Sequence, residues 1–185
     1  LAAETFGPAP MAHRDAASTT RMTAGAFTVR YSASPPTLHI SHGGRPLQTL
    51  SFDAAGPAMG FTLSHGPLLG FGQGGPQFDR KGETYNNRSG QGGYRLETHG
   101  GRVPIQWLVG TGDATNWGIF IHQPLGAFDL TGAAAVFTPA SDVPAYDIFL
   151  ASSSEPADLM KSFSTITGFP EMPPLWSLGY LQSHR

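Results

Sequence analysis

The chain of 185 residues contains no cysteine, which excludes disulfide bonds, thiolate zinc sites and a cysteine nucleophile. Only 13% of its residues are charged, and 11 lysines and arginines against 13 aspartates and glutamates give a formal net charge of −2. Because there is no basic surplus, nucleic acid is not expected as a partner. No hydrophobic run approaches the ~18 residues needed to cross a bilayer, so no membrane span is expected.

The first residues give an indication of the compartment. The chain opens Leu1-Ala2-Ala3-Glu4, with no initiating methionine and no charged and then apolar leader. Removal of a signal peptide leaves such a start, and so does trimming of the chain. We therefore expect a secreted or periplasmic protein.

Glycine and proline are abundant instead, with 24 and 16 residues, whereas the two together make up about 12% of average proteins. So many turn residues favour short strands over long helices. Residues 1–24 show no periodicity and predict a flexible N-terminal arm. Beyond them, hydrophobic segments separated by turns predict an all-β sandwich, with a hairpin turn at 42–45 and strands at 27–31, 37–40, 47–52, 59–64, 94–98, 104–109, 116–121 and 145–150.

One segment departs from the β pattern. In residues 154–166 the apolar side chains recur at helical spacing, which predicts a short helix at the end of the sandwich. Ser153 or Ser154 is placed to cap its start, and Gly168 is placed to end it. A proline-rich linker then leads into the apolar run 175–181, which is typical of the first strand of a buried parallel sheet.

The chemical motifs do not by themselves identify a catalytic centre. Residues 70–75 fit the pattern G-x-G-x-x-G, but no helical period follows, so a flexible loop or a set of tight turns is expected rather than a nucleotide site. The seven histidines form no H-E-x-x-H or equivalent cluster, and neither a metal nor another cofactor is expected. The aspartates lie mostly beside glycine, proline or serine and are interpreted as turn residues: Asp53, Asp79, Asp113, Asp129, Asp142 and Asp147.

Residues 73–93 combine charged and amide side chains with Tyr85 and, just beyond, Tyr94. Planar polar groups beside aromatic rings are what a sugar requires, because they grip neighbouring hydroxyls while a ring covers the C–H face. The alternative interpretation of this segment is an ordinary solvated loop.

Three blocks together carry a resemblance to a known family. They are GFGQGGPQFDRKG at 70–82, WGIFIH at 117–122 followed by Phe128-Asp129, and TGFPEMPPLWSLGYLQSHR at 167–185. In this order and spacing they resemble the N-terminal part of glycoside hydrolase family 31, which includes α-glucosidases, α-xylosidases and α-galactosidases. The third block is the most specific, and the resemblance extends over roughly residues 26–185.

The resemblance implies a galactose-mutarotase-like β-sandwich that runs into the first strand of a (β/α)8 barrel. Residues 25–170 would form the sandwich, and residues 171–185 would form the linker and the first strand of a barrel that is otherwise absent. The resemblance also implies a retaining, exo-acting α-glycosidase that removes terminal α-linked sugars from oligosaccharides. The catalytic aspartates of such enzymes lie on later barrel strands, so no catalytic residue is expected here and this segment alone is expected to be inactive.

In this family a loop of the sandwich reaches the substrate pocket, and here it corresponds to residues 85–91. The usual acidic residue falls on Ser89 or Gln91, neither of which is an acid, so a sugar other than glucose is a possible substrate. The residues expected to contact substrate are Asn87, Arg88, Ser89 and Gln91, with His184 and Arg185 at the end of the first barrel strand. Arg88 is the first to test, since a guanidinium grips two hydroxyls or an anionic substituent.

Two other kinds of function remain open from the residues alone. A free-standing carbohydrate-binding sandwich would work without a barrel, but its apolar run 175–181 would then be exposed. A scaffold that tethers or oligomerises an enzyme is compatible with the first hypothesis. The expected partners are therefore an α-glycoside or oligosaccharide, the C-terminal catalytic barrel of the same protein, and a second copy if the protein is a homo-oligomer.

Overall fold

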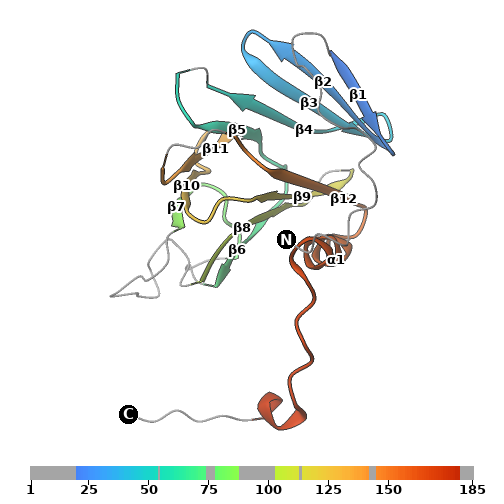
Figure 1. Cartoon of the computed structure of the whole chain (residues 1–185), viewed down its shortest axis with the longest axis vertical. Helices are drawn as coiled ribbons and strands as arrows, with labels where there is room; N and C mark the ends of the chain where they lie inside the picture. Colours follow the sequence, from blue (N-terminus) through green and yellow to red (C-terminus); the bar gives the residue numbers. More distant parts are fainter. Residues whose placement is uncertain are drawn as a thin grey trace.

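The computed structural model describes residues 20–53, 55–73, 78–87, 103–112, 114–141 and 145–179. Within these residues the chain forms two antiparallel sheets, one α-helix and one 3-10 turn (Figure 1). The larger sheet has the strand order β1 (Arg21–Ala24), β2 (Phe27–Ala33), β3 (Pro36–His42), β4 (Arg45–Phe52), β5 (Met59–Thr62), β11 (Ala134–Pro139), β10 (Gly126–Asp129) and β7 (Thr84–Asn87). The smaller sheet has the order β12 (Ile148–Ser153), β9 (Asn116–Ile121), β8 (Val103–Gly110) and β6 (Leu68–Gln73). The predicted all-β sandwich is confirmed.

The main core fills the space between the two sheets. Phe61 lies edge-on to both Trp117 and Phe128, at centroid distances of 6.3 Å, and Phe128 packs against Phe137 at 4.7 Å. All four rings are almost completely buried. Edge-to-face aromatic packing of this kind adds to the free energy gained from area burial alone.

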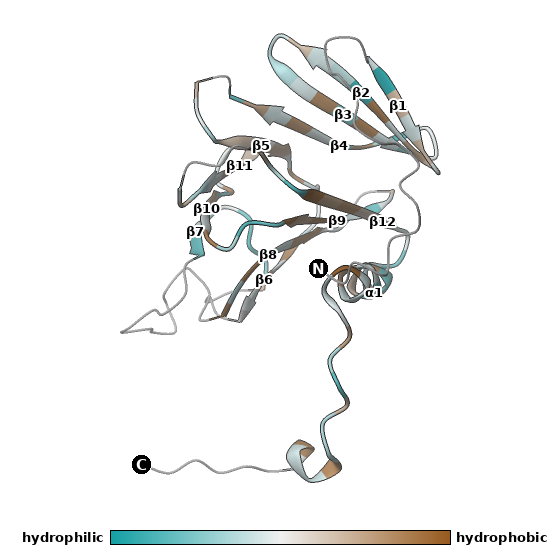
Figure 2. Ribbon diagram, in the orientation of Figure 1, coloured by the Kyte–Doolittle hydropathy of each residue, from teal (hydrophilic) through white to brown (hydrophobic). Residues whose placement is uncertain are grey.

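The smaller sheet is covered on both faces. On β8, Leu108 faces the main core, while Trp107 and Val109 face α1 (Pro156–Thr167) on the other side. Trp107 stacks on Phe163 of this helix with a centroid distance of 5.0 Å. Because both faces are buried, β8 and β9 read as nearly continuous hydrophobic runs, which Figure 2 shows as brown segments. The fold therefore has three layers, with the helix outermost.

Two glycines make room for the tryptophan rings of the smaller sheet. Gly110 lies directly opposite Trp117, and a Cβ atom at Gly110 would collide with that ring. A Cβ atom at Gly118 would collide with Trp107 on the neighbouring strand. At both positions a larger residue would force the neighbouring tryptophan ring to move.

Several sequence predictions are confirmed. Six of the predicted strands correspond to β2, β3, β4, β5, β8 and β9, and the turn at 42–45 joins β3 to β4 with positive φ at Gly43 and Gly44. The predicted helix is α1, and Gly168 ends it with φ 98°. The predicted serine cap is wrong, because Glu155 is the N-cap residue and makes no side-chain capping bond; Ser153 Oγ accepts the backbone N–H of Glu155 at 3.1 Å instead.

Other predictions are wrong in part. The last four residues of the predicted arm form β1, because a turn at Gly25 (φ 58°) pairs them with β2. Residues 70–72 are not a loop but part of β6, and they pair with β8 around a bulge. The last strand begins at Ile148 instead of 145. The predicted strand at 94–98 lies outside the described residues, as do residues 1–19 of the arm.

The end of the described chain also differs from its prediction. Leu175–Leu178 form a 3-10 turn, η2, in place of a strand, with the Ser177 N–H donating to the carbonyl of Pro174 at 2.9 Å. Figure 1 shows this segment running away from both sheets. A strand requires a hydrogen-bonded neighbour, and among the described residues none lies beside this segment, so a local i→i+3 bond forms instead. Residues 180–185 lie outside the described part.

Candidate substrate-binding site

The segment 78–87, which ends in β7, is fixed to the sandwich by Lys81. Its Nζ donates to the carbonyl oxygens of Ser64, His65 and Gly66 at 2.7, 3.0 and 2.7 Å. An ammonium group has three donors, so all of them are used in one tight turn. The segment 78–87 is thereby held against the turn that leads from β5 to β6.

Asp79 makes a second attachment between this segment and the sandwich. Its Oδ1 accepts the backbone N–H of Leu68 at 3.0 Å and that of Lys81 at 3.0 Å. The Asp79 carboxylate thus joins the start of β6 to its own turn, which is a structural use of a charged oxygen. Within the sequence block at 70–82, Asp79 and Lys81 therefore have a structural role: their hydrogen bonds attach this segment to the sandwich.

Arg80 lies inside the sandwich, with only 7% of its surface exposed. Its Nε donates to the carbonyl of Gly70 at 3.1 Å, and its guanidinium carbon lies 5.5 Å from the ring centroid of Tyr85. Gly70 has φ 136° and Gly72 has φ 75°, so the strand here adopts a backbone conformation that favours glycine. Burial raises the pKa of Tyr85, and this rise is opposed by the hydrogen bond and the charge of Arg80.

Asn87 ends β7 and marks the entry into residues 88–102. Its side chain is completely buried, and its Nδ2 donates to Oε1 of Gln106 at 2.9 Å. Gln106 Nε2 in turn donates to the carbonyl of Pro124 at 2.8 Å. This relay connects the end of β7 to β8 and to the turn between β9 and β10. Among the described residues, Asn87 Oδ1 has no hydrogen-bond partner.

The structure describes one of the six predicted substrate residues. Asn87 is held in the core by Gln106, so its side chain is not displayed on a surface where a sugar binds. The other five, Arg88, Ser89, Gln91, His184 and Arg185, lie outside the described residues and stay predictions. Sequence reasoning missed Gln106, although a lone amide within the apolar run 104–109 was a signal for a buried polar partner.

The turn interpretation of the aspartates is confirmed at three positions. Asp53 Oδ1 accepts the N–H of Ala55 at 2.8 Å, and Asp129 Oδ1 accepts both the N–H and the hydroxyl of Thr131 at 2.9 and 2.6 Å. Asp79 makes the equivalent bond to the residue two positions later. The hydroxyl and the N–H of Thr131 lower the pKa of Asp129, because they stabilise its ionised form. Asp113 and Asp142 lie outside the described residues. The prediction is wrong for Asp147, which lies in no turn and whose backbone carbonyl accepts the N–H of His122 at 2.9 Å.

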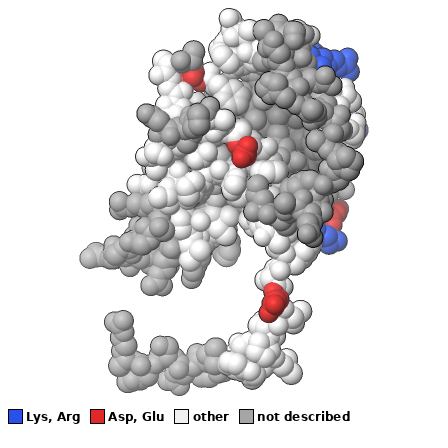
Figure 3. All heavy atoms as spheres, in the orientation of Figure 1, with Lys and Arg blue, Asp and Glu red and all other residues white. Residues whose placement is uncertain are grey.

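Charged side chains are sparse, and uncharged residues make up most of the described surface in Figure 3. In the described ranges, no group of three histidine, aspartate or glutamate side chains is arranged to hold a metal ion. No helix in this part of the chain is long and apolar enough to cross a membrane.

Comparison with solved structures decides the fold. A family 31 dextranase of Flavobacterium johnsoniae, solved with isomaltotriose, superimposes on 86% of this chain with a TM-score of 0.66 and 18% identity. The chain has the fold of the N-terminal part of family 31 glycoside hydrolases. A cycloalternan-degrading enzyme of Trueperella pyogenes matches 83% of the chain with a TM-score of 0.54 and 16% identity. No protein-family model matches the sequence.

A short sequence match points to the same family. Neutral α-glucosidase C of Mus musculus is 56% identical over 36 residues, which is 20% of this chain and 4% of the mouse protein. The present chain spans only 21% of the dextranase and 26% of the cycloalternan-degrading enzyme. The resemblance of the three sequence blocks to this N-terminal region is thus confirmed.

Proposed function

We propose that the chain is the N-terminal portion of a retaining, exo-acting α-glycosidase of family 31. The supporting observation is the structural match over 86% of this chain, which accounts for only 21% of the dextranase. The catalytic carboxylates would then lie on a barrel beyond Arg185. A general acid would protonate the glycosidic oxygen, a second carboxylate would form a covalent glycosyl-enzyme, and water would complete the reaction.

The contribution of the sandwich in this proposal is to position one wall of the substrate pocket. Lys81, Arg80 and Asn87 fix both ends of segment 78–87 to the sandwich, and residues 88–102 follow directly from it. A wall that is ordered before binding lowers the entropy cost of orienting a sugar. Arg88, Ser89 and Gln91 are the residues proposed to contact the sugar.

Exposed hydrophobic residues after α1 support the presence of a further domain. Leu175 and Trp176 are 85% and 74% exposed, and Phe169, Met172 and Leu178 are also largely uncovered. A soluble protein rarely leaves such a group of large apolar side chains in water. In our proposal the catalytic barrel of the same protein covers them, and the whole enzyme is secreted or periplasmic.

The test uses the complete protein and a panel of α-linked substrates. We would measure hydrolysis of p-nitrophenyl α-glucoside, α-xyloside and α-galactoside and of isomaltotriose, beginning with glucosides because the relatives include a dextranase and an α-glucosidase. We expect the released sugar to retain its anomeric configuration, which NMR would monitor during the reaction. The absence of hydrolysis across the panel would contradict the proposal.

The contribution of the loop is tested by variants of the active enzyme. Arg88→Ala and Gln91→Ala are expected to raise KM or to change the preference among sugars while the protein remains folded. Lys161→Ala, on the exposed face of α1, serves as the control and is expected to leave the kinetics unchanged. Unchanged kinetics in both loop variants on every substrate would refute the loop assignment.

Native mass spectrometry separates this proposal from a free-standing carbohydrate-binding module and also reports homo-oligomers. A folded 19.6 kDa chain that travels alone and binds oligosaccharides without cleaving them would favour the binding module. Association of this chain with a longer catalytic polypeptide would favour the hydrolase.

A further inference from the structure

The first strands of the larger sheet place like charges directly opposite each other. Arg21 on β1 is the register partner of Arg30 on β2, and Arg30 is the partner of His39 on β3. Directly paired residues lie on the same face of an antiparallel sheet, and like charges at such positions are destabilising. Among the described residues, no carboxylate forms an ion pair with either arginine. We call Arg21, Arg30 and His39 the basic ladder.

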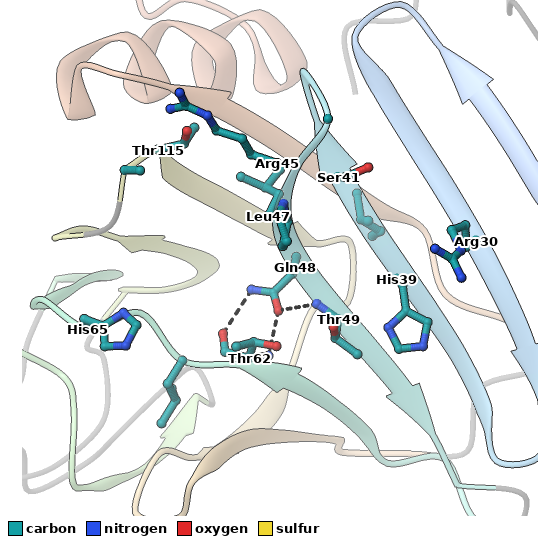
Figure 4. A pocket seen from close by; sticks show the side chains of 15 residues that line it. Arg30, His39, Ser41, Arg45, Leu47, Gln48, Thr49, Thr62, His65 and Thr115 are labelled. Carbon is teal, nitrogen blue, oxygen red and sulfur yellow. Dashed lines mark hydrogen bonds between the residues drawn. The ribbon is translucent and has the colours of Figure 1, made fainter.

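A cavity of about 680 Å³ adjoins this ladder. It is lined by β2, β3 and β4, by residues at and after the end of β5, and by residues just before β9 (Figure 4). Its charged or titratable lining residues are Arg30, His39, Arg45 and His65, and its hydroxyl groups come from Ser41, Thr49, Thr62 and Thr115. The described lining includes no aspartate or glutamate, although acidic residues outnumber basic ones in the whole chain.

The floor of the cavity is a fixed hydrogen-bonded unit. Gln48 is buried, and its Oε1 accepts the N–H of Thr62 at 2.6 Å and that of Thr49 at 2.9 Å. Its Nε2 donates to the carbonyl of Thr62 at 3.0 Å, as the dashed lines in Figure 4 show. Because the Gln48 amide is committed to the backbone, it is not available to bind a ligand.

The rim places its arginine and histidine side chains on several sides of this floor. The Gly43–Gly44 turn and a register shift between Ile40 and Ser41 shape the β3–β4 hairpin that carries Arg45. In Figure 4, Arg45 lies beside Thr115, Arg30 and His39 lie together at another side, and His65 lies across from them. The arginine side chains are exposed, so a ligand reaches them from solvent.

The composition of the lining indicates the class of ligand. A guanidinium binds a carboxylate or sulfate through two parallel hydrogen bonds, which an ammonium cannot reproduce. The described lining offers no phenylalanine, tyrosine or tryptophan ring, so the recognition of any ligand here depends on the polar groups. The volume is within the range of roughly 300–1,000 Å³ that small-molecule sites occupy and exceeds the needs of one inorganic anion.

We propose that this cavity binds an acidic oligosaccharide, with Arg30 and Arg45 each holding one of its carboxylate or sulfate groups. A bound anion also relieves the repulsion between Arg21 and Arg30. This inference rests on the proposed function in one respect: the molecule that carries the anionic groups is taken to be a sugar.

The test is isothermal titration calorimetry of the whole protein at low ionic strength, with three probes. Trigalacturonate is expected to bind, maltotriose of the same length is expected not to bind measurably, and sodium sulfate is expected to bind at least ten-fold more weakly than trigalacturonate. Arg30→Gln and Arg45→Gln are each expected to weaken trigalacturonate binding by about ten-fold or more. The matched control, Lys161→Gln, removes a positive charge from α1 and is expected to leave the affinity unchanged.

Thermal unfolding without ligand shows whether a variant that has lost binding is still folded. Arg30→Gln removes one of two like charges at paired positions, so the Tm of this variant is expected to equal or exceed that of the unchanged protein even though binding is lost. Equal binding of maltotriose, equal binding of sulfate, equal weakening by Lys161→Gln, or no binding of trigalacturonate would each overturn the inference. Binding of trigalacturonate by a protein that hydrolyses no α-glycoside would contradict the proposed function and leave this inference standing.

Discussion

Replacing Lys81 by methionine tests whether its three carbonyl contacts hold the segment before β7. The substitution keeps an unbranched side chain of similar length and removes only the ammonium group and its bonds to Ser64, His65 and Gly66. A hydrogen bond to a charged group contributes about 1.5–3 kcal/mol in favourable settings. Lys81 is partly exposed and one ion makes all three bonds, so we expect Lys81→Met to lower the free energy of unfolding by about 2–3 kcal/mol in total.

Urea denaturation followed by tryptophan fluorescence measures this loss. With a slope of roughly 2 kcal/mol/M, the midpoint should fall by about 1 M while the slope stays unchanged. Faster hydrogen exchange at the Arg80 amide, which donates to the Leu68 carbonyl at 2.8 Å, should accompany the change.

The matched control for this prediction is Lys161→Met on α1. Lys161 is 79% exposed and its Nζ lies 3.3 Å from Oδ1 of Asp158, three residues earlier on the helix. An exposed pair of this kind contributes about 0.5 kcal/mol or less. A loss at Lys81→Met no greater than the loss at Lys161→Met would refute the reasoning.

Three further predictions concern the core, the relay and a turn. Gly118→Ala should lower the free energy of unfolding by about 1–3 kcal/mol because the new methyl group overlaps a tryptophan ring. Urea denaturation measures this loss, and an unchanged midpoint would contradict the prediction. Gln106→Leu should lower the free energy of unfolding by about 1–3 kcal/mol because it leaves the buried amide of Asn87 without its partner. Adding Asn87→Leu should recover part of that loss in a double-mutant cycle, whereas simple additivity of the two losses would argue against the relay. The pKa of Asp129 is below its ordinary value of 3.8, so the stabilisation from this carboxylate is complete above pH 3.8 and is lost as the pH falls through the lower folded pKa. Thr131→Val should move that pKa upward in an NMR titration, and no upward shift would contradict the assigned cause.

The sequence alone determined the elements whose pattern reflects local physics. Residues 27–31 and 47–52 lie within strands, the two glycines at 43 and 44 form the hairpin turn, and 156–167 form the helix that ends at Gly168. Each of these signals depends on neighbours in the chain: alternation for a half-buried strand, positive φ for glycine, and helical spacing for one buried face. The sequence blocks at 70–82, 117–129 and 167–185 also indicated the family whose fold the structure shows.

The tertiary structure decided the features that depend on partners far away in the chain. The residues of β11 are alternately exposed and buried, but one of its buried residues is the small Ala135, so the hydrophobic alternation in the sequence is weak. Only the fold shows that Ala135 lies opposite Phe61 of β5. The apolar run at 175–178 forms a turn because strand formation requires a partner to pair with. Asn87 looked like a surface amide until Gln106 was placed beside it. Likewise, the pairing of Arg21 with Arg30 follows from the hairpin register, since the physical neighbours of a strand residue are set by hydrogen bonding across the sheet and not by the order of the sequence.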